Sequence, residues 1–169
     1  KLSAEDAQRY AAWSAARLSG AGSAASCGLF FGSITGGMLE GERYFSILSS
    51  KGARAAHVSR ISGQPTSAPA AAVARALGIR GPVESVAAAC SASTMAIEAA
   101  LLALRSGEID IALAGGADAL CQLTYGGFNA LRAVDELPAR PFRADRAGLS
   151  LGEGAGVLVL EREESALAR

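Results

Sequence analysis

The sequence predicts an α/β fold, in which short apolar strands alternate with helices built largely of small residues. Four apolar runs have the length of strands and are bounded by glycine, proline or polar residues: 27–31, 83–88, 109–114 and 157–160. Half of the 169 residues are hydrophobic, but only 5% are aromatic. We therefore expect a core of Ala, Leu, Val and Gly, which favours close packing of helices against a sheet.

The stretch around Cys90 combines a strand signal with a helix signal. The run 83–88 precedes Cys90, and Ser91, Ser93 and Thr94 can each cap the helix that follows. Cys90 is thus predicted to lie where a buried strand turns into a helix. A helix N-terminus stabilises an anion such as a thiolate by about 0.3–1 kcal/mol, and its N–H groups could hold the oxyanion of an attacked thioester. On spacing alone a buried, inert cysteine is the favoured interpretation, because free cysteines are often fully buried.

The chain before residue 64 contains two expected helices and a glycine-rich loop. A helix over 3–18 and a linker of small residues over 20–26 come first. The first strand leads into the glycine-rich loop 32–38. This loop lacks the lysine of a phosphate-binding loop, which argues against nucleotide binding. A helix is predicted over 39–48 and a loop over 52–63.

The next segments are assigned from their start and stop signals. His57, the only histidine, is interpreted as a surface or loop residue rather than a catalytic one. Ser67 predicts the start of a helix that has proline in its first turn and ends at Gly78. The run 109–114 is expected to be a second buried strand that ends at Gly115-Gly116.

Three features of the last part of the chain are interpreted as structural. Cys121 is expected to pack rather than to react. The loop 137–148 is rich in Arg and Asp and is expected to be held by solvated ion pairs. The glycines of 152–156 precede the buried strand 157–160, whereas those of a dinucleotide fingerprint follow a strand and open a helix. They are therefore expected to allow close approach of backbones.

Charge and cysteine content exclude several classes of partner. The formal net charge is zero and the arginines are scattered, so no nucleic-acid partner is expected. No apolar run reaches the roughly 18 residues of a membrane span, so no membrane partner is expected. The chain has three cysteines, Cys27, Cys90 and Cys121. Because they are odd in number and far apart in sequence, they fit neither a disulfide framework nor a zinc-binding motif. A reducing cytoplasm is expected, with no bound metal.

Four stretches, in order and at compatible spacing, resemble segments of the β-ketoacyl synthases, the condensing enzymes of fatty-acid and polyketide synthesis. They are the active-site segment 86–93, the strand segment 110–118, the Gly-Gly-Phe segment 126–131 and the Arg-Pro-Phe to Gly-Glu-Gly-Ala-Gly run 140–156. The matches cover most of the chain from about residue 27 to residue 163. The resemblance implies a thiolase-like fold, with helices layered against a mixed sheet. It also implies that residues 1–169 form one partial N-terminal domain.

The resemblance also implies a reaction and a set of site residues. Cys90 would take an acyl group from a carrier-protein thioester, and a malonyl thioester would then lose carbon dioxide and attack the acyl-enzyme. Thr35, where many family members have an apolar residue, and Phe128 would line the acyl pocket, although a core aromatic is an equal alternative for Phe128. The family's two catalytic histidines come from its second half, so this segment alone is expected to lack them. Arg143 stands where the family usually has Asp.

Partners and cofactors follow from the same resemblance. The acyl carrier protein, acyl and malonyl thioesters and a second copy of the chain in a homodimer are the expected partners, and arginines of the loop 137–148 could help to receive the acidic carrier. The chemistry needs no metal or organic cofactor.

Two other classes are weighed against this interpretation. A non-catalytic, ketosynthase-like subunit that sets chain length would generally lack the cysteine, so Cys90 argues against it. A thiolase or a simple acyltransferase is the other, but the glycine-rich run 152–156 and the segment Arg140-Pro141-Phe142 favour synthases that depend on a carrier protein.

Overall fold

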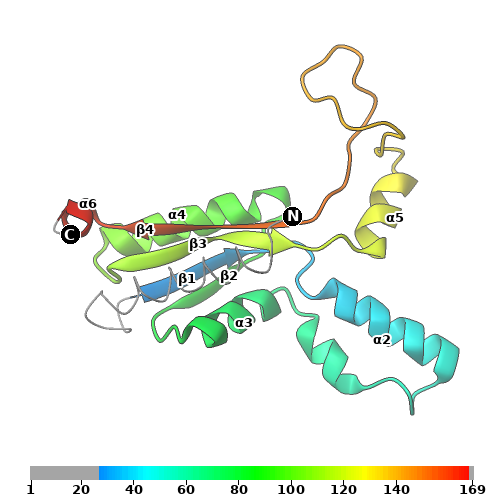
Figure 1. Cartoon of the computed structure of the whole chain (residues 1–169), viewed down its shortest axis with the longest axis horizontal. Helices are drawn as coiled ribbons and strands as arrows, with labels where there is room; N and C mark the ends of the chain where they lie inside the picture. Colours follow the sequence, from blue (N-terminus) through cyan, green and yellow to red (C-terminus); the bar gives the residue numbers. More distant parts are fainter. Residues whose placement is uncertain (1–26, 168–169) are drawn as a thin grey trace, which may run out of the picture.

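The computed structural model describes residues 27–167, in which four strands form one sheet in the order β2-β1-β3-β4 (Figure 1). The strands are β1 (Cys27–Gly32), β2 (Val83–Val86), β3 (Ile111–Asp118) and β4 (Gly154–Glu161). β1 is parallel to both β2 and β3, whereas β4 runs antiparallel to β3. The predicted combination of helices with a mixed sheet is therefore confirmed.

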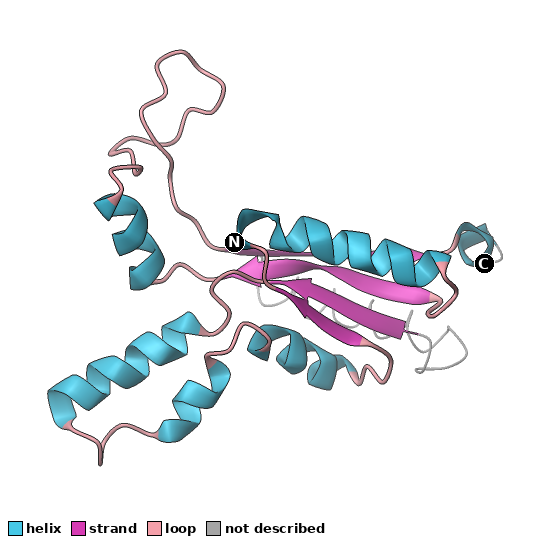
Figure 2. Ribbon diagram, turned by 180° about the vertical axis from the view of Figure 1, so that it is seen from behind, coloured by secondary structure: helices cyan, strands magenta, loops and turns pink. Residues whose placement is uncertain are grey.

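Helices cover both faces of this sheet, with α4 on one face and α3 on the other (Figures 1 and 2). Within residues 27–167 the helices are α2 (Met38–Lys51), α3 (Ala68–Leu77), α4 (Ala92–Arg105), α5 (Gln122–Ala130) and α6 (Glu163–Leu167), with 3₁₀ turns η2 (Val58–Gly63) and η3 (Ala89–Ser91). None of these helices has both the length and the apolar character that crossing a membrane would require.

The core forms because side chains along β1 alternate between the two helix layers. Phe30 packs on one face of the sheet against buried alanines of α4: Ala96, Ala100 and Ala103. Leu29 and Phe31 pack on the other face against buried alanines of α3: Ala70 and Ala74. Every residue of β1 is buried because strands flank it on both sides. The expected close packing of small-residue helices against the sheet is thus confirmed.

Two predicted strands are less buried than expected because both lie at sheet edges. β2 ends at Val86 rather than at residue 88, and its residues are exposed or half-buried. β4 forms the opposite edge, and half of Leu158 is exposed. An apolar run predicts a strand, but it does not tell an edge strand from a central one when the covering elements are unknown.

The strand was expected to end at Gly115-Gly116. Instead, β3 continues through both glycines to Asp118. A Cβ atom on Gly115 would lie 2.0 Å from the carbonyl oxygen of Gly156 in β4, and one on Gly116 would lie 2.2 Å from that of Gly32 in β1. Glycine is needed here because neighbouring backbones approach closely, not because the strand ends. The glycines of 152–156 were expected to allow such an approach, but a Cβ atom on Gly152, Gly154 or Gly156 would meet nothing within 4 Å, so it is Gly115 that the approach requires.

Most of the other expected elements are found. The helix predicted over 39–48 is α2, which is longer, and the helix predicted to end at Gly78 is α3, where Gly78 has a left-handed φ of 65°. The segment 52–63, expected to be a loop, contains the 3₁₀ turn η2. The expected helix 3–18 and linker 20–26 lie outside the described residues.

The loop after α5 is held by ion pairs, as predicted. Arg140 contacts carboxylate oxygens of Asp135 at 3.3 Å and of Asp145 at 3.2 Å, and the Nε atom of Arg143 lies 2.8 Å from Asp145. α2, α5 and this loop all extend from one end of the sheet (Figures 1 and 2). At that end the parallel strands β1, β2 and β3 have their carboxyl termini, where functional residues of α/β sheets commonly lie.

Candidate active site

Cys90 lies in the single 3₁₀ turn that joins β2 to α4, and its side chain is exposed. The turn is tight: the N–H of Ser91 donates to the carbonyl of Ala88 at 3.1 Å, and the N–H of Ala92 donates to that of Ala89. Ala89, the residue before the cysteine, has a left-handed φ of 45°. For a residue other than glycine this conformation costs about 1–2 kcal/mol, and such strain is typical of functional sites.

The start of α4 is not capped by a side chain. Ser91 occupies the N-cap position, as predicted, but its hydroxyl donates to the carbonyl of Ala88 at 2.7 Å instead of accepting from the helix. N–H groups of the first helical turn therefore have no side-chain partner from the cap. They lie beside Cys90, where they can bind a developing negative charge.

The cysteine turn is fixed against the sheet by glycines. A Cβ atom on Gly32, the last residue of β1, would lie 2.4 Å from the backbone carbon of Ala92 and 2.5 Å from the nitrogen of Ser93. A Cβ atom on Gly116 of β3 would lie 2.3 Å from the hydroxyl of Ser93. The first turn of α4 thus rests directly on the carboxyl ends of β1 and β3. This contact determines the position of Cys90.

Thr35 lies in the loop between β1 and α2, and its side chain does not have a free hydroxyl. The residue is 8% exposed, and the hydroxyl donates to Oδ1 of Asp118 at 2.9 Å. The same loop is joined to β2, because the N–H of Ser33 donates to the carbonyl of Val86 at 3.1 Å. Thr35 and Cys90 therefore follow neighbouring strands at one end of the sheet.

Phe128 is a half-buried residue of α5, a helix in which no residue is fully buried. Glu42 of α2 fixes the start of α5, since its carboxylate accepts from the N–H of Gln122 at 3.1 Å and of Leu123 at 2.7 Å. Two helices that extend from the same end of the sheet are thereby joined. Whether Phe128 lines an acyl pocket stays a prediction.

The other two cysteines and the histidine differ from Cys90 in their surroundings. Cys27 is buried in β1, and burial raises the pKa of its thiol to about 11. Cys121 is 3% exposed, with its sulfur 3.0 Å from the hydroxyl of Thr124, so its predicted packing role is confirmed. His57 is exposed at the start of η2, as expected. Cys90 alone of the three thiols is accessible.

Sequence reasoning missed Asp118 and Glu42, the two carboxylates that organise the segments around the site. A signal for Asp118 was present: a carboxylate at the carboxyl end of a buried strand is a common position for a functional residue. No local pattern marked Glu42, because its partners are 80 residues away in sequence. Within residues 27–167, no group of three or more His, Cys, Asp or Glu residues could hold a metal ion.

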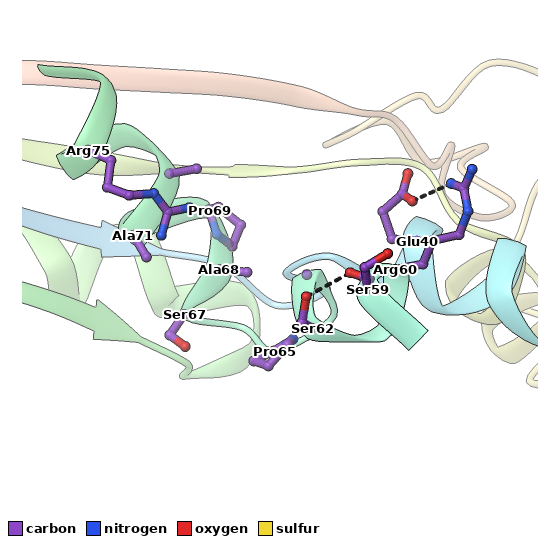
Figure 3. Close-up of a pocket in the computed structure, with 12 residues that line it drawn as sticks. Glu40, Ser59, Arg60, Ser62, Pro65, Ser67, Ala68, Pro69, Ala71 and Arg75 are labelled. Carbon is purple, nitrogen blue, oxygen red and sulfur yellow. Dashed lines mark hydrogen bonds and ion pairs between the residues drawn. The ribbon is translucent and has the colours of Figure 1, made fainter. Parts of the chain in front are cut away.

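A separate groove of about 780 Å³ lies between η2 and α3 (Figure 3). It is lined by Ser62, Pro65 and Ser67 among others, and at one end Arg60 pairs with Glu40 at 2.8 Å. None of its lining residues belongs to the cysteine turn or to the loop of Thr35.

Comparisons with known proteins agree with this geometry. The profile of the family described as "Beta-ketoacyl synthase, N-terminal domain" matches residues 4–166. Nodulation protein E of Rhizobium leguminosarum bv. trifolii is 46% identical over 131 residues, which cover 76% of this chain and 32% of that protein. The 3-oxoacyl-[acyl-carrier-protein] synthase 2 of Rhizobium meliloti (strain 1021) is 40% identical over 99 residues, which cover 54% of this chain and 24% of that protein.

Solved structures share the fold. A type II polyketide ketosynthase, in complex with its acyl carrier protein and bound to a hexaketide, has a TM-score of 0.79 and 28% identity. The match covers 86% of this chain and 39% of that one, so the thiolase-like fold implied by the resemblance is confirmed. The chain spans about a third of the length of the nodulation protein E relatives that it matches. The match to the family profile over residues 4–166, together with the shared fold, shows that the chain belongs to the β-ketoacyl synthase family.

Proposed function

We propose that this chain is part of a β-ketoacyl-[acyl-carrier-protein] synthase of fatty-acid or polyketide synthesis, and that residues 1–169 form one partial N-terminal domain. The observation that carries the proposal is the position of Cys90. It is an exposed thiol on a strained turn beside an uncapped helix N-terminus, whereas both other cysteines are buried. The exposed Cys90 argues against a non-catalytic chain-length subunit.

Cys90 is the nucleophile of the first half-reaction. Its thiolate attacks the carbonyl carbon of an acyl thioester, and the oxyanion forms beside the N–H groups at the start of α4. Collapse of the tetrahedral intermediate breaks the bond to the sulfur of the carrier, which leaves as a thiolate and takes a proton from solvent. The acyl group then remains as a thioester of Cys90.

The second half-reaction forms the carbon–carbon bond. A malonyl thioester loses carbon dioxide, and the resulting carbanion attacks the carbonyl carbon of acyl-Cys90. The bond to the Cys90 sulfur breaks, which releases a β-ketoacyl thioester and restores the thiolate. The negative charge on the malonyl thioester oxygen needs positioned donors. The only histidine of this chain is the exposed His57, so these donors are assigned to the family's two histidines outside the chain.

Thr35 and Phe128 are proposed to contact the acyl chain. The loop of Thr35 begins where β1 contacts the first turn of α4, and α5 extends from the same end of the sheet. Because the hydroxyl of Thr35 is engaged by Asp118, the side chain would present its methyl group rather than a polar atom. Both roles are compatible with an apolar substrate.

The proposed partners are the acyl carrier protein and a second copy of the chain. A related ketosynthase has been solved with its carrier protein, which supports the first partner. β2 lies at an edge of the sheet with 45% of Val83 exposed, which supports a homodimer through this edge. The three cysteines are free thiols, which supports a cytoplasmic location. No metal or organic cofactor is required.

The proposal is tested on the full-length protein with acyl and malonyl thioesters of an acyl carrier protein. We expect an acyl adduct on Cys90 by mass spectrometry, and a β-ketoacyl product with carbon dioxide when the malonyl thioester is added. Cys90→Ala should abolish both, whereas the matched control Cys121→Ala should retain both. An adduct on another residue, or turnover in Cys90→Ala, would overturn the assignment.

A further inference from the structure

Asp118 accepts four hydrogen bonds from a single neighbouring loop, residues 33–35. Its Oδ1 atom accepts from the N–H groups of Ile34 and Thr35, both at 2.8 Å. It also accepts from the hydroxyls of Ser33 and Thr35, both at 2.9 Å. These donors come from residues more than 80 positions away in sequence. The carboxylate at the end of β3 therefore fixes the path of the chain as it leaves β1.

The bonds to Asp118 extend one step further into the loop. The hydroxyl of Ser33, which is completely buried, donates to Asp118 and accepts from the N–H of Gly36 at 2.8 Å. Gly36 has a left-handed φ of 53°, so the loop turns sharply at this point. Partial burial raises the pKa of the Asp118 carboxyl, but the hydrogen bonds from Thr35, Ser33 and Ile34 outweigh this effect and lower it below its usual range. The carboxylate is thus held in its charged form.

The position of this loop is coupled to the cysteine turn through backbone contacts. Gly32 of β1 is paired with Gly116 of β3, and both contact the first turn of α4. Ser33 follows Gly32, and Asp118 lies two residues after Gly116. The loop that Asp118 holds therefore begins at the contact that positions Cys90.

We propose that Asp118 is a positioning residue that fixes Thr35 and the loop 33–36 beside the acyl pocket, and thereby determines which acyl chains Cys90 accepts. This inference rests on the proposed function and deepens it. Asp118 acts on selectivity rather than on reactivity, because the hydrogen bonds that close the cysteine turn do not involve it. The loop forms a wall for the substrate, whereas the turn carries the nucleophile.

The first test variant removes the charge of Asp118 but keeps the shape of its side chain. In Asp118→Asn the amide oxygen can still accept, but charge-assisted hydrogen bonds are about twice as strong as neutral ones, so the loop is held less firmly. Thr35→Val is a second, milder variant, which removes one donor and leaves both backbone bonds. Asp110→Asn is the matched control. Asp110 lies just before the first residue of β3, at the end of the strand away from Asp118, where it pairs with Arg162.

Each variant of the full-length protein is assayed with acyl-carrier thioesters from two to sixteen carbons. We expect Asp118→Asn to change the ratio of kcat/KM for long and short acyl donors by roughly tenfold or more. Thr35→Val should shift the same ratio in the same direction by less, and Asp110→Asn should leave it unchanged. The rate at which iodoacetamide alkylates Cys90 should stay within about twofold of wild type in all three variants.

The outcomes separate the two levels of the proposal. If wild type acylates Cys90 and both Asp118→Asn and Thr35→Val keep its selectivity, the positioning role is overturned while the proposed function stands. If Asp118→Asn lowered kcat/KM equally for all acyl thioesters and also slowed the alkylation of Cys90, Asp118 would have a merely structural role. This result would also overturn the inference. If wild type transfers no acyl group from any donor, the proposed function fails and the selectivity role fails with it.

Discussion

Gly32→Ala should displace the cysteine turn without changing Cys90 itself. The added Cβ would lie 2.4 Å from the backbone carbon of Ala92, 2.5 Å from the nitrogen of Ser93 and 2.6 Å from the carbonyl oxygen of Ala92. These are all backbone atoms, so no flexible side chain can move away. Ordinary van der Waals contact begins at 3.4 Å, so the start of α4 must shift by about 1 Å relative to β1.

The magnitude of the effect follows from two separate consequences of that shift. Overpacking of this kind costs about 1–3 kcal/mol of unfolding free energy, or more where only backbone can move. A misplacement of about 1 Å at a catalytic group can lower the rate about 10²-fold. Denaturant unfolding and the rate of Cys90 acylation by an acyl-carrier thioester measure the two quantities independently.

The matched control is Gly63→Ala, because a Cβ atom there meets nothing within 4 Å and Gly63 does not have a left-handed φ. It should retain the stability and the acylation rate of wild type. If Gly32→Ala also retained both, α4 would not rest on β1 as described, and this contact would not position Cys90.

Three further predictions concern reactivity, packing and pH. Iodoacetamide at pH 8 should label Cys90 first, because Cys90 is exposed and Cys27 is buried. A thiol with a pKa of about 11, such as that of Cys27, is ionised in only about one molecule in 10³ at that pH. Peptide mapping that finds Cys27 labelled first would contradict the burial of β1. Ala100→Leu should cost about 1–3 kcal/mol in denaturant unfolding, because Ala100 is completely buried between α4 and the sheet; wild-type stability would contradict that packing. The pKa of Asp118 is lowered in the folded protein, so its stabilising contribution is fully present above the unfolded pKa of about 3.9 and is lost as the pH falls through the folded pKa. Unfolding of Asp118→Asn should therefore depend less on pH below about pH 4 than unfolding of wild type, and identical pH profiles would show that the carboxylate contributes nothing in this range.

The strands and the cysteine turn could be predicted because their signals are local. The apolar run 27–31 reads as a buried strand, and Cys90 follows another apolar run and precedes a helix rich in alanine. What could not be predicted depends on partners that are distant in sequence. On sequence alone, the glycines at 115–116 indicate the end of a strand. They are recognised as part of β3 only when the close approach of Gly156 and Gly32 is known.

The candidate site divides in the same way. The neighbours of Cys90 predict its place between a strand and a helix, but its catalytic role, like the roles of Thr35 and Phe128, rests on the family resemblance. Asp118 was missed because its function is to accept hydrogen bonds from residues 33–35, which no sequence window contains together with it. The edge positions of β2 and β4 depend on strand order, which an apolar run does not encode.

The connection between β3 and β4 has a consequence for how this protein can diverge. The two strands pair directly from Asp118 and Gly154 to Ile111 and Glu161, yet α5 and the long loop lie between them in sequence. The entropic cost of closing a loop grows slowly, by only about 0.6 kcal/mol for each doubling of its length. Changes in the length of 119–153 should therefore cost the pairing of β3 and β4 little. A change in the length of the segment that carries Phe128 should thus alter the surroundings of Cys90 more than the pairing of the strands beneath it.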